Sequence, residues 1–259
     1  MKYSPNTRNA YKIGILSLIL CCKKAAGDIL TQDIKEWMNN LTLNGISKNS
    51  IRVKLAGIRA FFKFLLEENV ITSDPSNSAL LKITNVRPKK RKRLTDDQIF
   101  YMRDALKSNV KNRTIFEILF STAIRVSELV NIKIEDVLLG EDLIIIKVSK
   151  RKRQRFVFLS YECRVSLAKY MKMMVENKTN PHLFPGKNDK PITRQGVWKM
   201  LNKYSHSIDV TFNSSPHRIR RTTGYKLLKE GMDYEYVMWI LGHKNPVSTQ
   251  VYIEEDDED

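Results

Sequence analysis

The sequence predicts a mainly α-helical protein of two domains, with a small β-sheet in the second domain. Apolar residues recur at helical spacing through residues 1–86 and again through most of residues 94–259. A run at 87–93, in which six of seven residues are basic, separates these parts. One pair of strand-like segments lies in the second part. We therefore expect an N-terminal helical domain at 1–86, a basic linker at 87–93 and a C-terminal domain at 94–259.

Charge and composition narrow the class of partner. The chain has 259 residues, a formal net charge of +17 and 42% hydrophobic residues, so it can build cores and is not a disordered basic tail. A folded chain this basic usually binds a polyanion, most often nucleic acid. A ribosome-associated or merely lysine-rich protein is the alternative. The apolar segment 13–22 is too short to span a bilayer and has no cleavage site, so we expect a cytoplasmic protein with no membrane partner.

Three helices are expected in the first domain. Ser4 marks the start of the first, the second begins at Thr31 and ends at Asn44-Gly45, and the third begins within 47–50. The third helix has an apolar stripe, and its other face is basic. The basic residues are Lys48, Arg52, Lys54, Arg59 and Lys63. Because few acidic residues lie at helical spacing from them, we expect this face to contact DNA, with simple solvation as the alternative.

The linker is expected to be flexible, because its like charges repel and Pro88 disfavours helix in the residue before it. A linker that lies along DNA between two domains needs such charge, whereas a nuclear-localisation role fits its position less well. The expected DNA-contacting residues are Lys89, Lys90, Arg91, Lys92 and Arg93.

The second domain opens at Leu94-Thr95, a helix cap followed by acidic residues. An apolar helix at 115–124 leads into the segment STAIRVSELV, which contains Arg125. Glu128 follows one turn later and is expected to orient a guanidinium group or to cap the next helix. Farther on, the segments 143–148 and 156–159 read as two strands joined by a basic turn.

The stretch 216–252 carries the most informative spacing. His217 and Arg220 lie three residues apart, which places both on one face of a helix. Gly242-His243 follows, and Tyr252 comes nine residues after His243. The intervening apolar segment 225–241 has helical period and is expected to hold the two polar clusters at a fixed separation. A cationic fork, two imidazoles and a phenol could then converge on one phosphate.

This combination resembles the tyrosine recombinases, also called the phage integrases. The resembling motifs are HRIR, LGH and a tyrosine nine residues after that histidine, in this order. STAIRVSELV resembles the first box of the family, with Ala123 where a glycine is usual, and Arg221 stands where the family usually has histidine. The resemblance covers nearly the whole chain and implies a helical, SAM-like core-binding domain followed by an α-rich catalytic domain.

The resemblance implies a role for each motif residue. Tyr252 would be the nucleophile, Arg125 and Arg220 would bind the phosphate oxygens, and His217 and His243 would assist. Lys150, in the basic turn, would protonate the leaving oxygen, with Lys147 and Lys152 as competitors. Two other basic residues of this segment, Lys152 and Arg153, would contact phosphates, with contact to water alone as the alternative. No metal, ATP or other cofactor is expected, and the three cysteines have no metal-ligand spacing.

The implied partner is double-stranded DNA with paired recombination half-sites, bound by a homo-oligomer that grows from dimer to tetramer. A partner recombinase or accessory protein is a further candidate. The implied role is an Xer-type one, either dimer resolution on a chromosome or plasmid, or integration and excision of a mobile element. Two other functions are left open: relaxation of DNA by a type IB topoisomerase mechanism, and non-catalytic DNA binding.

Overall fold

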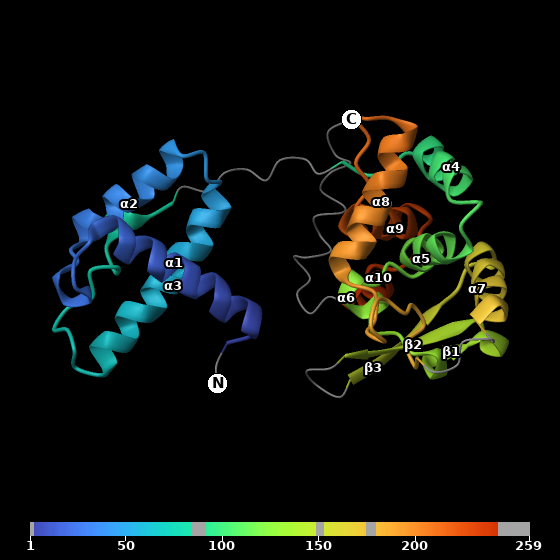
Figure 1. Ribbon diagram of the computed structural model, residues 1–259, viewed down its shortest axis with the longest axis horizontal. Helices are drawn as coiled ribbons and strands as arrows, with labels where there is room; N and C mark the ends of the chain where they lie inside the picture. Colours follow the sequence, from blue (N-terminus) through green and yellow to red (C-terminus); the bar gives the residue numbers. More distant parts are fainter. Residues whose placement is uncertain (1–2, 84–91, 149–152, 175–179, 243–259) are drawn as a thin grey trace. The chain divides into compact units, whose positions relative to one another are not determined.

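The computed structural model describes residues 3–83, 92–148, 153–174 and 180–242, apart from the side chains of Val148 and Arg153 (Figure 1). The chain divides into two compact units, Met1–Lys89 and Lys90–Asp259, hereafter the N-terminal and C-terminal units. The fold is mainly α-helical, with one three-stranded antiparallel sheet in the C-terminal unit. The predicted fold class is thus confirmed.

The N-terminal unit contains the helices α1 (Pro5–Cys22), α2 (Thr31–Leu43) and α3 (Lys48–Glu67), and the short 3-10 helices η1 (Ala26–Asp28) and η2 (Ala79–Leu81). The predicted helix starts are confirmed. The hydroxyl of Ser4 accepts a hydrogen bond from the backbone N–H of Thr7, and that of Ser47 accepts one from Ser50, each at 3.2 Å. Such caps satisfy N–H groups that have no partner within the helix.

Two glycines bring α1 and α3 into close contact. A Cβ at Gly14 would lie 2.9 Å from the carbonyl oxygen of Lys54, and a Cβ at Gly57 would lie 2.7 Å from the Cα of Tyr11. Any side chain at either glycine would push the two helices apart. Around this crossing, α1, α2 and α3 bury an apolar core that includes Leu18, Ile34, Trp37, Ile58 and Phe62.

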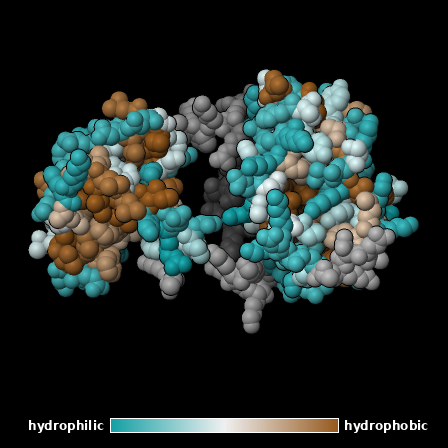
Figure 2. Space-filling model, viewed as in Figure 1, coloured by the Kyte–Doolittle hydropathy of each residue, from teal (hydrophilic) through white to brown (hydrophobic). Residues whose placement is uncertain are grey.

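The outer face of α1 is apolar and exposed. Ile13, Leu16 and Leu20 recur at helical spacing, and about half or more of each side chain is exposed. On the face shown in Figure 2, apolar surface gathers on the N-terminal unit, whereas the C-terminal unit is mostly hydrophilic. The core of the N-terminal unit does not use this stripe of α1.

The C-terminal unit is built around α5 (Val110–Thr122), which packs against α7 (Tyr161–Met174) and α9 (Pro216–Lys229). The other helices are α4 (Asp96–Ala105), α6 (Val126–Leu129), α8 (Arg194–Ile208) and α10 (Tyr234–Leu241), with the 3-10 helices η3 (Ile134–Asp136) and η4 (Leu139–Glu141). The predicted cap at Thr95 is confirmed, since its hydroxyl accepts from Gln98 N. The helix predicted to reach Ile124 ends at Thr122, because Ala123 adopts the left-handed conformation with φ 49°.

The sheet has the order β1 (Val137–Leu138), β2 (Leu143–Val148) and β3 (Arg153–Phe158). β3 begins at Arg153, three residues before the predicted Phe156, because the register with β2 extends to the pair Val148–Arg153. The pairs Ile144–Val157 and Ile146–Arg155 point inward and are buried. Since side chains alternate between the faces of a strand, the pair Lys147–Gln154 points to the opposite face.

The apolar segment 225–241, whose period is helical, is divided between two helices. α9 ends at Lys229 and α10 begins at Tyr234, with Gly231 between them at φ 85°. The carboxylate of Asp233 accepts from the backbone N–H of Glu235 at 2.7 Å and so starts the second helix. The end of α10 is therefore held against α9 by tertiary contacts, including the bond from Arg220 to the carbonyl of Leu241, and not by one rigid helix. Val237 and Leu241 of α10 pack against Ala123 in a small apolar cluster.

Candidate active site

Arg125 lies directly before α6, at the turn that follows α5. Ala123 makes this turn with a left-handed backbone. The Ala123 side chain is buried and packs against Val237 and Leu241 of α10. The family usually has glycine here, which adopts this conformation without the steric cost that a Cβ brings. The Arg125 side chain is 40% exposed, so its charge faces solvent at the surface of the C-terminal unit.

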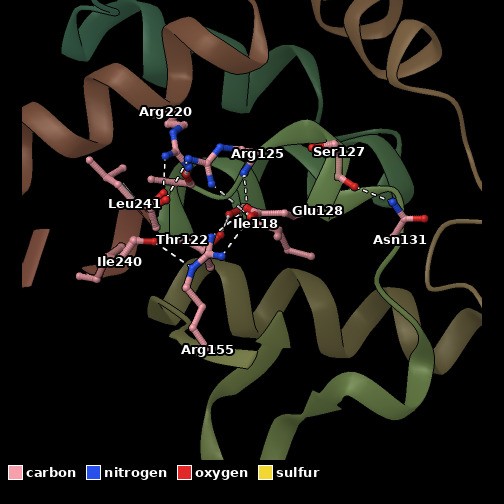
Figure 3. A network of polar contacts seen from close by, with 12 residues as sticks. Ile118, Thr122, Arg125, Ser127, Glu128, Asn131, Arg155, Arg220, Ile240 and Leu241 are labelled. Atoms are coloured by element: carbon pink, nitrogen blue, oxygen red, sulfur yellow. Dashed lines mark hydrogen bonds and ion pairs between the residues drawn. The ribbon is translucent and has the colours of Figure 1, made fainter. Parts of the chain in front are cut away.

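Arg220 lies on α9 and is only 5% exposed. Its Nη1 donates to the carbonyl of Ala123 at 2.6 Å, and its Nη2 donates to the carbonyl of Leu241. These two carbonyls are the last acceptors of α5 and α10, where helices leave C=O groups without a partner in the helix. The buried guanidinium thus joins the ends of α5 and α10 (Figure 3).

Gly242 ends α10 and lies against two guanidinium groups. Its φ is 59°, and a Cβ here would lie 3.2 Å from Cζ of Arg155 and 3.3 Å from Nη1 of Arg125. Its carbonyl accepts a hydrogen bond from Nη2 of Arg125 at 3.0 Å. Backbone conformation and close packing both favour glycine at this position. The described chain therefore brings Arg125 and Arg220 to the residues directly before His243.

Glu128 links Arg125 to a third arginine. One carboxylate oxygen accepts from the backbone N–H of Arg125 at 2.8 Å, and the other lies 3.3 Å from Nη1 of Arg125. Arg155 donates to both oxygens, at 3.0 and 2.8 Å. Burial alone would raise the pKa of Glu128, but the hydrogen bonds and charge of Arg155, helped by Arg125, hold the pKa below its usual value. The prediction that Glu128 orients a guanidinium and caps the next helix is confirmed.

Arg125, Arg155 and Arg220 all donate to carbonyls of residues 240–242 and are called the arginine cluster hereafter. Arg155 is the member of this cluster that sequence reasoning missed. It is 8% exposed, and besides Glu128 its Nε donates to the carbonyl of Ile240 at 3.2 Å. The sequence pointed to β3 as a strand but gave Arg155 no role. The alternation of side chains along the strand could have revealed it, because Arg155 lies two residues before Val157 and therefore points to the same, inward face. A charged residue in an inward position needs a buried partner.

His217 lies in the first turn of α9. The hydroxyl of Ser215 caps this helix by accepting from the backbone N–H of Arg218 at 3.2 Å. His217 and Arg220 both lie on α9, as predicted, and their spacing of three residues gives them one helix face. His217 is exposed whereas Arg220 is buried, and Arg221, at the position where histidine is usual, is buried as well.

Several predicted residues lie outside the part of the chain that the structure describes. They are Lys150, Lys152, His243 and Tyr252, together with the linker from Lys89 to Arg91. Arg153 belongs to β3, but its side chain also lies outside the description. The part of the site that the structure describes is therefore the arginine cluster with Glu128, together with His217.

Lys147, the competitor of Lys150, is described. Its ammonium group pairs with Asp136 and, at 3.2 Å, with Glu135. Hydrogen bonds to these two carboxylates raise the pKa of Lys147 above its usual value, which makes it a weaker acid. It also points to the sheet face opposite Arg155. Lys147 therefore lies away from the arginine cluster.

The basic face of α3 is narrower than predicted. At about 100° per residue, Lys48, Arg52, Arg59 and Lys63 fall within about 60° of one another, and all four are exposed. Lys54 instead faces α1, where its backbone and Cβ contact the position of Gly14, and it is half-buried. The prediction that Lys54 shares this face is therefore wrong, because its place in the helix turns it toward α1.

The end of the linker is anchored on α9. Cζ of Arg93 lies 3.6 Å from the centroid of the Tyr225 ring, and the Arg93 carbonyl accepts from Nη2 of Arg218 at 2.8 Å. The next residue, Leu94, donates its N–H to the hydroxyl of Thr222 at 2.8 Å. The Arg93 side chain thus packs on Tyr225 of the same unit, whereas the sequence predicts that it contacts DNA. Lys92 is exposed.

The described ranges contain neither a metal cluster nor a membrane-spanning helix. No three His, Cys, Asp or Glu residues in these ranges lie close enough together to hold a metal ion. None of the helices described is long and apolar enough to cross a membrane.

Comparison with known proteins agrees with these observations. Residues 92–259 match the Phage integrase family, and residues 1–69 match the family described as phage integrase, N-terminal SAM-like domain. The tyrosine recombinase XerC of Leptospira interrogans is 31% identical over 261 residues, which cover 97% of this chain and 83% of the relative. The tyrosine recombinase XerC of Bacillus subtilis is 29% identical, over 85% of this chain and 75% of the relative.

Solved structures share the fold. A Tn1549 transposon integrase in complex with transposon right-end DNA has a TM-score of 0.82 and 18% identity, covering 97% of this chain and 90% of that one. A λ integrase dimer bound to a COC′ core site has a TM-score of 0.80 and 18% identity, covering 99% of this chain and 74% of that one. Together with the family match over most of the sequence, these findings show that the chain belongs to the phage integrase family, the tyrosine recombinases.

Proposed function

We propose that this chain is a site-specific recombinase that cleaves and rejoins DNA strands through a covalent 3′-phosphotyrosyl intermediate at Tyr252. One observation carries the proposal. Arg125 and Arg220, which are 95 residues apart in the sequence, both donate hydrogen bonds to carbonyls at the end of α10, directly before His243. Two guanidinium groups held beside the LGH motif form a site suited to a phosphate.

The reaction conserves the number of phosphoester bonds. The phenolic oxygen of Tyr252 attacks the scissile phosphorus, the bond from phosphorus to the 5′-oxygen breaks, and a 3′-phosphotyrosine and a free 5′-hydroxyl result. The phenol loses its proton, and the leaving 5′-oxygen gains one. Attack by a 5′-hydroxyl of another duplex reverses these steps and exchanges strands. Because bond energy is kept in the phosphotyrosine, ATP is not needed, and we propose no metal or other cofactor.

The two arginines stabilise charge on the non-bridging oxygens as the transition state forms. Arg220 is fixed by buried carbonyl contacts, which preorganise it, whereas Arg125 is partly exposed and can reach a phosphate from solvent. His217 and His243 donate hydrogen bonds to the phosphate or move the proton of the tyrosine.

Lys150 acts as the acid that protonates the 5′-oxygen. Lys147 suits this role poorly, because it pairs with two carboxylates and points to the opposite face of the sheet. Lys152 remains the competitor and is tested with Lys150. With Arg153, it would otherwise contact phosphates.

The substrate is double-stranded DNA with paired half-sites. The exposed face formed by Lys48, Arg52, Arg59 and Lys63 supports a phosphate contact from the N-terminal unit, and the linker adds Lys89, Lys90, Arg91 and Lys92. We propose a homo-oligomer on DNA, from dimer to tetramer, with a partner recombinase or accessory protein as a further component. The solved λ integrase relative is a dimer on its core site. DNA as substrate implies a cytoplasmic protein.

The physiological role follows one of two patterns. Resolution of chromosome or plasmid dimers is suggested by the XerC relatives, and integration or excision of a mobile element by the transposon and phage integrases. Relaxation of supercoils by a type IB topoisomerase reaction is the alternative chemistry, and non-catalytic DNA binding is the alternative without chemistry. A plasmid relaxation assay run beside a two-site recombination assay separates these three.

Covalent capture tests the proposal and identifies the site. The protein is incubated with sheared genomic DNA of the organism that carries its gene, denatured in detergent, recovered with its attached strands, and the strands are sequenced. We expect strands that end at one recurrent sequence with two inverted half-sites. Recovery of no more DNA than with Tyr252→Phe would contradict the proposal. Random ends would favour the topoisomerase reaction.

A further inference from the structure

Arg155 holds three parts of the C-terminal unit together from one buried position. Its guanidinium donates two hydrogen bonds to Glu128, at the start of α6, and one to the carbonyl of Ile240, in α10. Its own strand, β3, returns from the turn that contains Lys150. The start of α6, the strand β3 and the end of α10 therefore meet at one side chain (Figure 3).

Of the two guanidinium groups that bind the carboxylate of Glu128, that of Arg155 is the closer. Both oxygens of Glu128 face the fork of Arg155 at 2.8 and 3.0 Å, while the side chain of Arg125 lies farther away, at 3.3 Å. An Arg–carboxylate pair with two parallel bonds is the strongest arrangement that such groups form. The carboxylate is therefore bound more closely by the guanidinium of Arg155 than by that of Arg125, and the Arg125 side chain is 40% exposed.

We infer that Arg155 is a positioning residue for strand cleavage: by holding Glu128 and the end of α10, it keeps the pairing of Glu128 with Arg125 longer and weaker than its own, so that the charge of Arg125 stays available for the scissile phosphate. The inference rests on the proposed function, since it assigns a part in the same reaction. Arg155 is buried, and its contacts with the described residues at this site are with Glu128, Ile240 and Gly242. We assign it no contact with the reacting atoms, so its proposed role is positioning and not catalysis.

Removal of Arg155 frees Glu128 to turn toward Arg125. The two residues are already joined through the backbone N–H of Arg125 and through a longer side-chain ion pair of 3.3 Å, so Glu128 needs only a small movement to pair more closely with Arg125. A buried carboxylate that loses its partner will bind the nearest cation. Arg155→Met should therefore weaken the chemical step, and a second substitution, Glu128→Gln, should restore part of it by removing the competing charge.

The experiment measures covalent-complex formation in a single turnover at saturating protein, on a nicked duplex that carries the captured cleavage site. We expect Arg155→Met to be slower than the wild type by about 100-fold, the size of effect that a small misplacement near reacting groups produces. Arg155→Met combined with Glu128→Gln should be at least about tenfold faster than Arg155→Met alone. If Arg155 served fold stability alone, the double variant should be slower than Arg155→Met, because the destabilising effects of two core substitutions add.

Arg103→Met is the matched control. Arg103 binds Glu117 through two bonds of 2.9 Å each, and Glu117 is fully buried, but this pair lies on α4 and α5 outside the cluster. Arg103→Met removes a comparable ion pair. At a temperature where circular dichroism shows that the variant is folded, its cleavage rate should equal that of the wild type. Arg155→Lys serves if Arg155→Met does not fold; it keeps the charge, loses the fork and should be slower by at least about tenfold.

The outcomes separate this inference from the proposed function. No covalent complex with the wild-type protein overturns the proposed function. A wild-type complex, with Arg155→Met and Arg155→Lys at the wild-type rate, overturns only the role of Arg155. That role is also overturned if the double variant is slower than Arg155→Met, or if Arg103→Met slows the reaction as much. Partial restoration in the double variant, with a normal rate in the control, supports the inference.

Discussion

Arg125 donates a hydrogen bond from its Nη2 to the carbonyl of Gly242 at 3.0 Å, and this contact joins two segments that are 117 residues apart in the sequence. It ties the first family box to the residue before His243. The same glycine has a left-handed backbone, and a Cβ there would lie 3.2 to 3.3 Å from the guanidinium groups of Arg155 and Arg125, which would have to shift. The glycine of the LGH motif is thus explained by how closely two guanidinium groups approach it.

Gly242→Ala should impair both stability and cleavage. The left-handed conformation should cost about 1–2 kcal/mol in the free energy of unfolding. Displacement of Arg125 and Arg155 should slow covalent-complex formation by about 100-fold. The control is Gly231→Ala, because Gly231 also has positive φ but nothing lies within 4 Å of its Cβ position. Equal loss of cleavage in both variants would show that backbone strain, not contact with the guanidinium groups, sets the requirement.

Lys150→Ala should be rescued by chemistry on the substrate. If Lys150 protonates the 5′-oxygen, a 5′-bridging phosphorothiolate, whose sulfur leaves without a proton, should be cleaved at nearly the wild-type rate. On ordinary DNA the same variant should be slower by about 100-fold or more. Lys147→Ala should cleave both substrates normally, since Lys147 is bound to Asp136 and Glu135. Equal impairment of Lys150→Ala on both substrates would make it a phosphate ligand and would leave Lys152 as the acid.

The linker should account for several units of the salt dependence of DNA binding. Each phosphate contact contributes about 0.9 to the slope of log K against log salt. Changing Lys89, Lys90, Arg91 and Lys92 to glutamine should therefore lower the slope by up to about four units. Arg93→Gln should barely change the slope and should instead cost about 1 kcal/mol of stability, because its guanidinium lies over Tyr225. An unchanged slope in the fourfold variant would mean that the linker does not touch DNA.

Comparison of the sequence-based predictions with the structure shows which features a single sequence reveals. The helix caps at Ser4, Ser47 and Thr95 were predictable, because capping is local chemistry. The break at Gly231 was missed, since a helical apolar period continues through it and only the left-handed glycine interrupts the backbone. Periodicity reports which face is apolar and says little about where one helix stops.

Arg155 and Lys54 were misjudged for a different reason. Both are basic residues in basic segments, and composition suggests solvent or DNA for each. Arg155 is buried because the strand register turns it toward Glu128, and Lys54 is half-buried because Gly14 lets α1 approach α3. Arg125, Arg220 and His217 could be singled out as candidates because they lie in short motifs that resemble those of the family. The residues that support them depend on tertiary contacts that a single sequence does not reveal.

The Glu128–Arg155 pair should make the C-terminal unit sensitive to acid. A carboxyl group whose pKa is lower in the folded chain than in the unfolded chain adds stability above its unfolded pKa of about 4.3, and this stability is lost as the pH falls through the folded value. The difference in the free energy of unfolding between the wild type and Glu128→Gln should therefore shrink as the pH falls below about 4. Calorimetry between about pH 7 and about pH 3 measures it, and a difference that does not change with pH would show that Glu128 is not charged in the folded protein.

The identity of the nucleophile decides the whole account. The wild-type protein is incubated with a nicked duplex carrying the captured cleavage site, denatured, and digested with protease and nuclease, and its peptides are sequenced by mass spectrometry. We predict a nucleotide attached through phosphate to Tyr252, and no denaturant-resistant adduct with Tyr252→Phe, whose DNA affinity should stay close to that of the wild type. An adduct on another residue, or one that persists in Tyr252→Phe, would contradict the account.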